Sequence, residues 1–208
     1  MTVENAHGEA ASGAARWNHN IHYHTFLLRA LPQECERALD VGCGEGVFAR
    51  KLRRHVTHVS AIDTDETSIE IARAQDLAGE IDYLLADFFT FPFQPASFDF
   101  VVCVAALHHM DATAALQRMR ELLRTGGRLA ILGLPRSRYP LDLPRDAAAT
   151  IASRAHQLVK GTWESPAPTV WPPAQTFQEV RALAESLLPG ALVRRLLLWR
   201  YSLVWTKP

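Results

Sequence analysis

The sequence predicts an α/β fold with a doubly wound, mostly parallel, seven-stranded sheet that ends in an antiparallel C-terminal hairpin. Two observations predict this fold. Between residues 37 and 134, short apolar runs alternate with helical patterns, which is typical of repeated βαβ units. After residue 190, two apolar runs follow each other almost directly, which favours an antiparallel pair at a sheet edge.

In the first half of the chain, each expected element ends at a residue that breaks its pattern. Pro32 ends the first helix, and Gly42, Asp63 and Asp87 follow the first three apolar runs. Asp65 is a suitable N-cap, because its side chain can accept from free N–H groups of the next helix. The expected helices of this half are 20–31, 47–55 and 65–74, and the expected strands are 37–41, 56–62 and 81–86.

The second half continues this alternation and then departs from it. Residues 98–105 are almost wholly apolar, as in a central strand that is covered on both faces. Gly126 and Gly127 end a helix, and Pro135 ends the fifth strand. Residues 136–174 hold one helical stretch and a segment rich in proline and tryptophan. The expected strands are 98–105, 128–134, 191–197 and 200–206, and the expected helices are 112–123, 144–159 and 176–187.

Length and charge indicate an ordinary globular enzyme or binding protein. The 208 residues suit a single domain over 1–208. Lys plus Arg and Asp plus Glu each number 22, so no overall basic field favours nucleic acid or a membrane as partner. Cys35, Cys43 and Cys103 have neither disulfide-framework nor zinc spacing, so we expect no metal and a reducing cytoplasm. The sequence shows no signal peptide and no apolar stretch of membrane-spanning length.

A glycine-rich turn after the first expected strand is the main chemical motif. Gly42, Gly44 and Gly46 follow the strand, and glycine lets a backbone turn sharply and approach a ligand closely. A dinucleotide-binding turn needs a third glycine where this chain has Val47. Asp40, two residues before the glycines, would repel a pyrophosphate and suits a ligand with an ammonium group.

Two further carboxylates follow successive expected strands. Asp63 comes after the second strand and Asp87 after the third, on the side of the sheet where doubly wound folds bind ligands. Taken singly, Asp63 is also compatible with a place beside a helix cap, and Asp87 with a solvated turn. Their order along the chain favours a shared ligand site.

With this turn and these carboxylates, the sequence resembles the class I S-adenosylmethionine-dependent methyltransferases that act on small molecules such as ubiquinone precursors. The resemblance covers about residues 17–135 and, more loosely, the final hairpin. It implies a Rossmann-like methyltransferase fold and S-adenosylmethionine as the cofactor. It also implies that one segment surrounds the methionine part of this cofactor: Asp40, Gly42, Cys43, Gly44 and Gly46.

The resemblance assigns roles to the strand-end residues as well. Asp63, followed by Thr64, would bind the ribose hydroxyls, and one carboxylate can accept from both. Asp87, between Ala86 and Phe88, would accept from the adenine amino group, and Phe88 would pack on the ring.

The exit of the fourth strand carries the candidate catalytic residues. The family often has a Ser-Phe-Asp opening, present here at 97–99, and a Leu-His-His stretch after the strand. Val104 and Ala105 would border the methyl-donor sulfur, and His108 or His109 would remove the acceptor's proton. Alternatively, one histidine packs or contacts the cofactor while the other caps the following helix. The Asn/Asp-Pro-Pro-aromatic motif of DNA amino-methyltransferases is absent, which disfavours base methylation.

Two segments outside the βα alternation are expected to cover the site. Residues 1–31 would form an N-terminal lid in which Trp17 and Tyr23 lie near the sulfonium, because aromatic faces attract cations. A solvated helix face, core packing and a functionless tail are the alternatives. Residues 136–174, with Trp163 and Trp171, would cover the acceptor, and a plain structural loop is the alternative.

The resulting hypothesis is methyl transfer from S-adenosylmethionine to oxygen, nitrogen or carbon of a small-molecule acceptor, by SN2 displacement. The products would be the methylated acceptor and S-adenosylhomocysteine. The enzyme would chiefly align the reactants and exclude water. The competing hypotheses are a cofactor-binding partner or sensor without catalysis, and a nicotinamide-dependent oxidoreductase. The sequence does not predict an oligomeric state.

Overall fold

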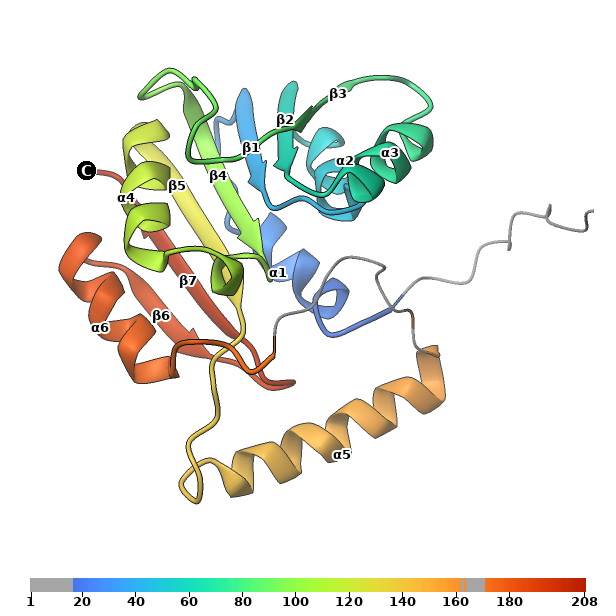
Figure 1. Ribbon diagram of the computed structural model, residues 1–208, viewed down its shortest axis with the longest axis vertical. Helices are drawn as coiled ribbons and strands as arrows, with labels where there is room; N and C mark the ends of the chain where they lie inside the picture. The colour runs from blue at the N-terminus through green and yellow to red at the C-terminus, as the bar shows by residue number, and fades with distance from the viewer. Residues whose placement is uncertain (1–16, 162, 164–170) are drawn as a thin grey trace, which may run out of the picture.

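A computed structural model describes residues 17–161, 163 and 171–208 of the chain. Its strands are β1 (Arg37–Val41), β2 (His58–Asp63), β3 (Ile81–Leu85), β4 (Phe98–Val104), β5 (Leu123–Gly133), β6 (Leu192–Arg195) and β7 (Tyr201–Thr206). They form a seven-stranded sheet in the order β3-β2-β1-β4-β5-β7-β6 (Figure 1). Strands β1 to β5 pair in parallel, and β7 pairs antiparallel with both β5 and β6. The predicted fold class is confirmed.

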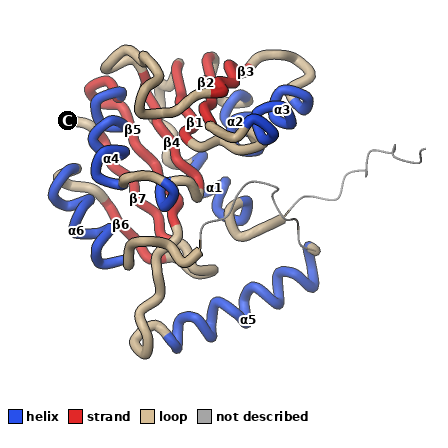
Figure 2. The backbone as a smooth tube through the Cα atoms, in the orientation of Figure 1, coloured by secondary structure: helices blue, strands red, loops and turns tan. Residues whose placement is uncertain are grey.

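Helices cover both faces of this sheet (Figure 2). They are the short 3-10 helices η1 (Ile21–Tyr23) and η2 (Leu107–His109), and α1 (His24–Leu28), α2 (Val47–Arg53), α3 (Glu66–Gln75), α4 (Ala112–Leu122), α5 (Leu143–Lys160) and α6 (Phe177–Leu187). Helices α1, α2 and α3 share one apolar core with one face of the sheet. Helices α4 and α6 share the second core with the other face.

The central strands supply both cores because successive side chains point to opposite faces. In β5, Leu129 and Ile131 pack toward α4 and α6, whereas Ala130 and Leu132 pack toward α1 and α2. All four of these side chains are fully buried. A strand that is covered on both faces is therefore apolar throughout, which is the pattern its sequence shows.

Helix α5 lies apart from the sheet, at the end of the molecule opposite to the amino-terminal ends of β1 and β2 (Figure 1). Of its residues, Ala149 and Ser153 are buried. Asp142, just before the helix, accepts a hydrogen bond from the Arg195 guanidinium of β6 at 2.6 Å. This ion pair joins the start of α5 to the edge strand of the sheet. No helix in the described part of the chain is long and apolar enough to cross a membrane.

Three predicted elements are wrong in their limits. The helix expected at 20–31 is only η1 followed by α1, because the chain turns after Leu28 to enter β1. Strand β5 begins at Leu123 rather than Arg128. Gly126 and Gly127 therefore lie within this strand, where its pairing with β4 is irregular, and do not end the preceding helix. The turn between β6 and β7 spans 196–200, longer than the two residues expected.

We predict that Gly133→Ala destabilises the join between β5 and β7. An added Cβ would lie 2.1 Å from the Cζ atom of the buried Tyr201 ring, so the ring must move. Overpacking of this kind costs about 1–3 kcal/mol of unfolding free energy, which urea denaturation measures. Tyr201→Ala removes the clash and serves as the control: in the double variant, Gly133→Ala should cost much less. Additive losses would contradict this explanation.

Candidate active site

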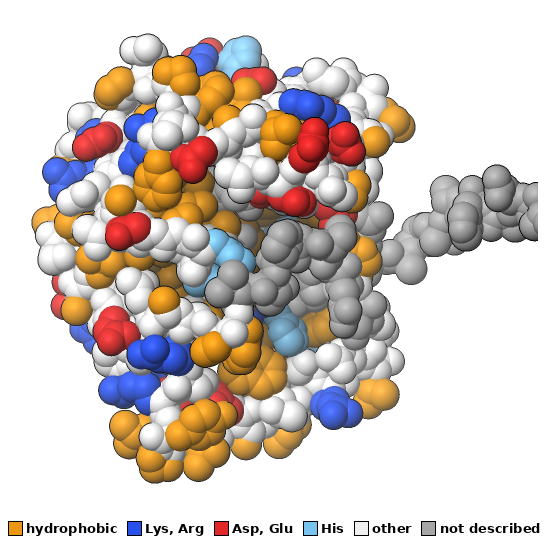
Figure 3. Space-filling view, viewed as in Figure 1, with side chains coloured by type: hydrophobic (Ala, Val, Ile, Leu, Met, Phe, Trp, Pro, Cys, Tyr) orange, Lys and Arg blue, Asp and Glu red, His pale blue; other side chains and the backbone are white. Residues whose placement is uncertain are grey.

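A cavity of about 880 Å³ opens at the carboxyl ends of β1, β2 and β4. The order of strands reverses between β1 and β4, and doubly wound sheets bind ligands at such a point. Figure 3 shows histidine side chains near the middle of this face, below a group of acidic side chains. The predicted site residues that line the cavity are Trp17, Asp40, Gly42, Cys43, Gly44, Asp63, Thr64, Ala86, Asp87, Phe88, Val104, Ala105, His108 and His109.

The glycine turn depends on positive φ angles. Gly42, Gly44 and Gly46 have φ values of 68°, 51° and 69°, a region that side chains with a Cβ rarely adopt. A Cβ on Gly42 would also lie 2.3 Å from that of Ala106. Gly46 does not line the cavity; it precedes α2 and packs under Tyr83, whose hydroxyl would be 2.5 Å from an added Cβ. The turn is therefore shaped by close packing as well as by flexibility.

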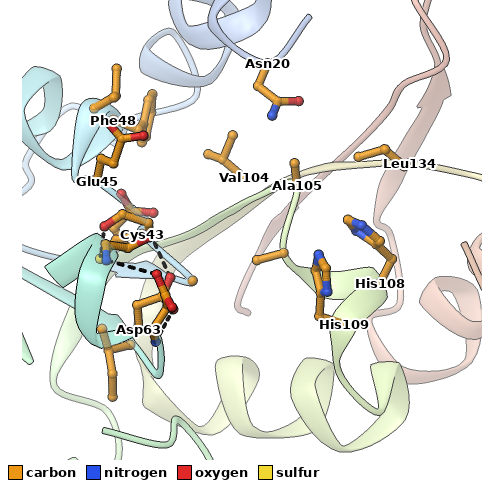
Figure 4. Close-up of a pocket in the computed structure, with 18 of the residues that line it drawn as sticks. Asn20, Cys43, Glu45, Phe48, Asp63, Val104, Ala105, His108, His109 and Leu134 are labelled. Carbon is orange, nitrogen blue, oxygen red and sulfur yellow. Dashed lines mark hydrogen bonds between the residues drawn. The ribbon is translucent and has the colours of Figure 1, made fainter. Parts of the chain in front are cut away.

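Asp63 joins this turn to the end of β2. Its carboxylate accepts from the Gly44 N–H at 2.8 Å and from the Asp65 N–H at 3.0 Å (Figure 4). Two backbone donors orient the side chain before any ligand arrives. Because a carboxylate has more lone pairs than these two bonds use, it can accept further hydrogen bonds from the cavity.

Asp40 is a buried carboxylate at the base of the turn. It is 1% exposed, and neither oxygen has a hydrogen-bond partner among the described residues. Burial, reinforced by the nearby charge of Asp63, raises the pKa of Asp40 to about 7. The Ala49 N–H partly offsets this rise in pKa without reaching hydrogen-bond geometry. An unsatisfied buried carboxylate beside a cavity is suited to a cationic ligand.

Asp87 and Phe88 line the outer end of the cavity, beyond β3. The Oδ1 atom of Asp87 accepts from the N–H groups of Phe89 and Thr90, at 2.6 and 3.2 Å. Phe88 is 5% exposed, and the Arg118 guanidinium lies 5.5 Å from its ring centroid. The Arg118 Nε also donates to the Phe88 carbonyl at 2.7 Å, so Arg118 contacts both the ring and the backbone of Phe88.

The exit of β4 turns the chain sharply toward the two histidines. Ala105 has a φ of 55°, a strained conformation for a residue with a side chain, and its N–H donates to the Leu132 carbonyl at 2.7 Å. The ring centroids of His108 and His109 lie 4.1 Å apart, and the buried Nδ1 of His108 has no partner among the described residues. Burial, then the neighbouring His109 and Arg200, lowers the pKa of His108 to about 4. Burial also lowers the pKa of His109, so both rings are neutral at pH 7.

The N-terminal segment lies between the cavity and α5. Trp17 is 4% exposed, and its carbonyl accepts from the Trp163 N–H at 2.9 Å. The His19 Nε2 lies 2.8 Å from the Ser153 Oγ of α5. Tyr23 does not line the cavity, because its hydroxyl donates to the Leu197 carbonyl at 2.7 Å. Trp163 lines the cavity, whereas Trp171 is 67% exposed.

Parts of the expected lid and cover, residues 1–16, 162 and 164–170, lie outside the described residues. Where the chain is described, no three His, Cys, Asp or Glu side chains are grouped so that they could hold a metal ion.

Several cavity residues are not predicted by the sequence. They come from the N-terminal segment, α2, the end of β5, α5 and the β6–β7 turn: Asn20, Phe48, Leu134, Gln157 and Arg200. Glu45 also lines the cavity and lies inside the glycine motif, so its position was a usable signal. The Arg200 side chain reaches the cavity only through the β6–β7 turn, and no local pattern indicates this.

Known proteins resemble the chain in both sequence and structure. The model of a family described as "Methyltransferase domain" matches residues 39–131. An uncharacterized methyltransferase of Mycobacterium tuberculosis is 41% identical over 196 residues, which are 92% of this chain and 98% of that protein. A ubiquinone biosynthesis O-methyltransferase of Xylella fastidiosa is 34% identical over 122 residues, 54% of this chain and 47% of that protein.

The solved structures agree with this result at the level of the fold. A SAM-dependent methyltransferase from Aquifex aeolicus superposes with a TM-score of 0.61 at 16% identity, covering 89% of each chain. This likeness shows a shared architecture, and the relative from M. tuberculosis, similar over nearly its whole length, shows the family. The chain therefore belongs to the class I S-adenosylmethionine-dependent methyltransferases, and S-adenosylmethionine is its cofactor.

Proposed function

We propose that this enzyme transfers the methyl group to a small-molecule acceptor by direct displacement inside the cavity. When bound, S-adenosylmethionine supplies a methyl group on a positively charged sulfur, which is a good leaving group. The observation that carries the proposal is the arrangement in Figure 4, where the glycine turn and Asp63 face His108 and His109 across the cavity.

The residues of the turn fit this cofactor. Asp40 is a buried carboxylate without a hydrogen-bond partner in the described chain, and a cationic ammonium or sulfonium group favours its ionised form. Asp63 is oriented by the Gly44 and Asp65 N–H groups and can accept from the ribose hydroxyls. Of the two Asp87 oxygens, Oδ1 is used within its own turn, which leaves Oδ2 for the adenine amino group.

The opposite side of the cavity fits an acceptor that loses a proton. His108 and His109 are neutral at pH 7 because burial lowers their pKa values, so each has an unprotonated ring nitrogen. Both histidines line the cavity, and an unprotonated ring nitrogen there can take a proton from a hydroxyl or amine nucleophile.

We further propose that residues 17–24 act as a lid and that 136–174 cover the acceptor. Trp17 and Asn18 line the cavity from the first segment, and Gln157 and Trp163 line it from the second. The two segments are joined by the hydrogen bond between the Trp17 carbonyl and the Trp163 N–H. A cover of this kind excludes water during the transfer.

We predict that S-adenosylhomocysteine binds with micromolar affinity and that Asp63→Asn weakens this binding about ten- to a hundredfold. The amide loses the charge that the ribose hydroxyls and the Gly44 N–H contact, and such contacts contribute about 1.5–3 kcal/mol. Titration calorimetry measures the affinities. Asp82→Asn, which changes an exposed carboxylate on β3, is the matched control. Equal affinities for Asp63→Asn and the parent protein would show that Asp63 has only a structural role.

We predict that the methyl group reaches a small molecule rather than a protein or nucleic acid. Incubation of the enzyme and methyl-labelled S-adenosylmethionine with separated fractions of a bacterial extract should label the small-molecule fraction. His108→Gln should lower the labelling and leave S-adenosylhomocysteine affinity nearly unchanged, because its proposed role concerns the acceptor. Label confined to the protein or nucleic-acid fraction would refute the proposed acceptor class.

We predict that Asp40→Asn stabilises the ligand-free protein at pH 8 while it weakens cofactor binding. The folded-state pKa of about 7 lies above the reference value of 3.8, so folding favours the protonated form. Stability therefore falls as pH rises from about 4 to 7, by about 1.4 kcal/mol for each unit of pKa difference. The neutral amide should remove most of this fall, measured by urea denaturation at pH 5 and pH 8. An unchanged pH dependence in the variant would contradict the assigned cause.

A further inference from the structure

Arg200 is a buried cation that lines the cavity from the β6–β7 turn. It is 8% exposed, and burial lowers its pKa to about 10. Its Nε donates to the Asn20 Oδ1 at 2.8 Å, and its Nη1 donates to the carbonyls of Leu198 and Trp199 at 3.2 and 3.3 Å. All three acceptors are neutral groups.

This guanidinium lacks an anionic partner in the described part of the chain. No carboxylate there lies within ion-pair distance of it, and its Nη2 has no hydrogen bond to a described residue. Burying a charge is costly unless the charge is paired, and charged side chains are rarely fully buried without a partner. Among the described residues, Arg200 is therefore a buried cation without an anionic partner.

The turn that positions Arg200 is itself strained. Leu198 and Trp199, immediately before it, have φ values of 57° and 54°. Two consecutive left-handed residues normally call for Asn and Gly, because a Cβ is unfavourable in this conformation. Strain of this kind persists where the surrounding structure imposes it, and it clusters at ligand sites. Here it places the guanidinium on the cavity.

The cavity is also divided by charge. Its acidic side chains all lie at or just after the carboxyl ends of β1, β2 and β3: Asp40, Glu45, Asp63, Asp65 and Asp87. Arg200 lies on the other side, near His19 and His108, and its charge contributes to the lowered pKa of both. Figure 4 shows the same division, with Glu45 and Asp63 on one side and His108, His109 and Leu134 on the other. A cationic cofactor is favoured at the acidic end, and an anion at the end with Arg200.

We propose that Arg200 selects a methyl acceptor that carries an oxyanion, a carboxylate or phosphate, and holds that group through its Nη2 beside His108. This inference rests on the proposed function, because it concerns the acceptor half of the same cavity. The oxyanion supplies the missing counter-ion, and a neutral analogue leaves the cation unpaired, so the site discriminates between them. Leu134 and Trp163, which also line the cavity, offer apolar surface to the body of the acceptor.

S-adenosylmethionine also carries a carboxylate. The experiment must therefore show whether Arg200 binds the oxyanion of the acceptor or the carboxylate of the cofactor. Arg200→Met removes the charge and keeps an apolar stem of similar length. Arg194→Met, on the exposed side of the same hairpin, is the matched control. Arg200→Lys keeps a positive charge at this position. The probes are benzoate, phenyl phosphate and neutral benzamide, each titrated into protein saturated with S-adenosylhomocysteine.

We expect the parent protein and Arg194→Met to bind at least one of the two oxyanions about tenfold or more tightly than benzamide. Arg200→Met should lose this preference and keep the affinity for S-adenosylhomocysteine, and Arg200→Lys should keep part of the preference.

Three results would overturn the proposal. The first is a parent protein without preference for either oxyanion, and the second is a preference that survives in Arg200→Met. The third is a tenfold loss of S-adenosylhomocysteine affinity in that variant, which would assign Arg200 to the cofactor's own carboxylate. Failure of the parent protein to bind S-adenosylhomocysteine would contradict the proposed function itself. Titration of this ligand alone, before the probes are added, therefore distinguishes a failure of the proposed function from a failure of the Arg200 proposal.

Discussion

The hydrogen bond from the Gly44 N–H to the Asp63 carboxylate ties the end of β1 to the end of β2, and the geometry of the cavity depends on it. The Ile62 carbonyl adds to this link by accepting from the N–H groups of Gly42 and Cys43. Together these bonds bend the chain away from the sheet directly after Val41. The bend leaves the Asp40 carboxylate beneath the turn, where water is excluded and no hydrogen bond within the described chain replaces it.

Two buried charged groups then determine what the cavity can hold. Asp40 and Arg200 lie in different halves of it, and the burial of each is costly because no described residue of opposite charge pairs with it. Natural proteins keep such costs where function requires them. The apolar cores on the two faces of the sheet offset this cost, since β1, β4 and the second half of β5 are almost fully buried. The site is thus a local exception within a well-packed fold.

The parallel half of the fold and the antiparallel pairing of the hairpin follow from local sequence, whereas the turn of the hairpin does not. Apolar runs that end at Gly42 and Asp63 predicted β1 and β2 well, because period and turn chemistry agree there. The pattern at 20–31 was helical, but the chain turns after Leu28 to enter β1, so the helix is only α1. Arg200 could not be predicted, because its position depends on a strained turn and on Asn20, which is distant in sequence.

The charge of Arg200 also links acceptor binding to proton transfer. In the free cavity this charge helps to lower the pKa of His108, which makes the imidazole neutral but weakly basic. In the proposed complex, an oxyanion beside the guanidinium would offset the positive potential at the ring, so the pKa of His108 would rise when the acceptor binds. In its proposed role, the histidine would then be a stronger base in the presence of the molecule whose proton it removes. An anionic acceptor would in this way supply part of the electrostatics of its own methylation.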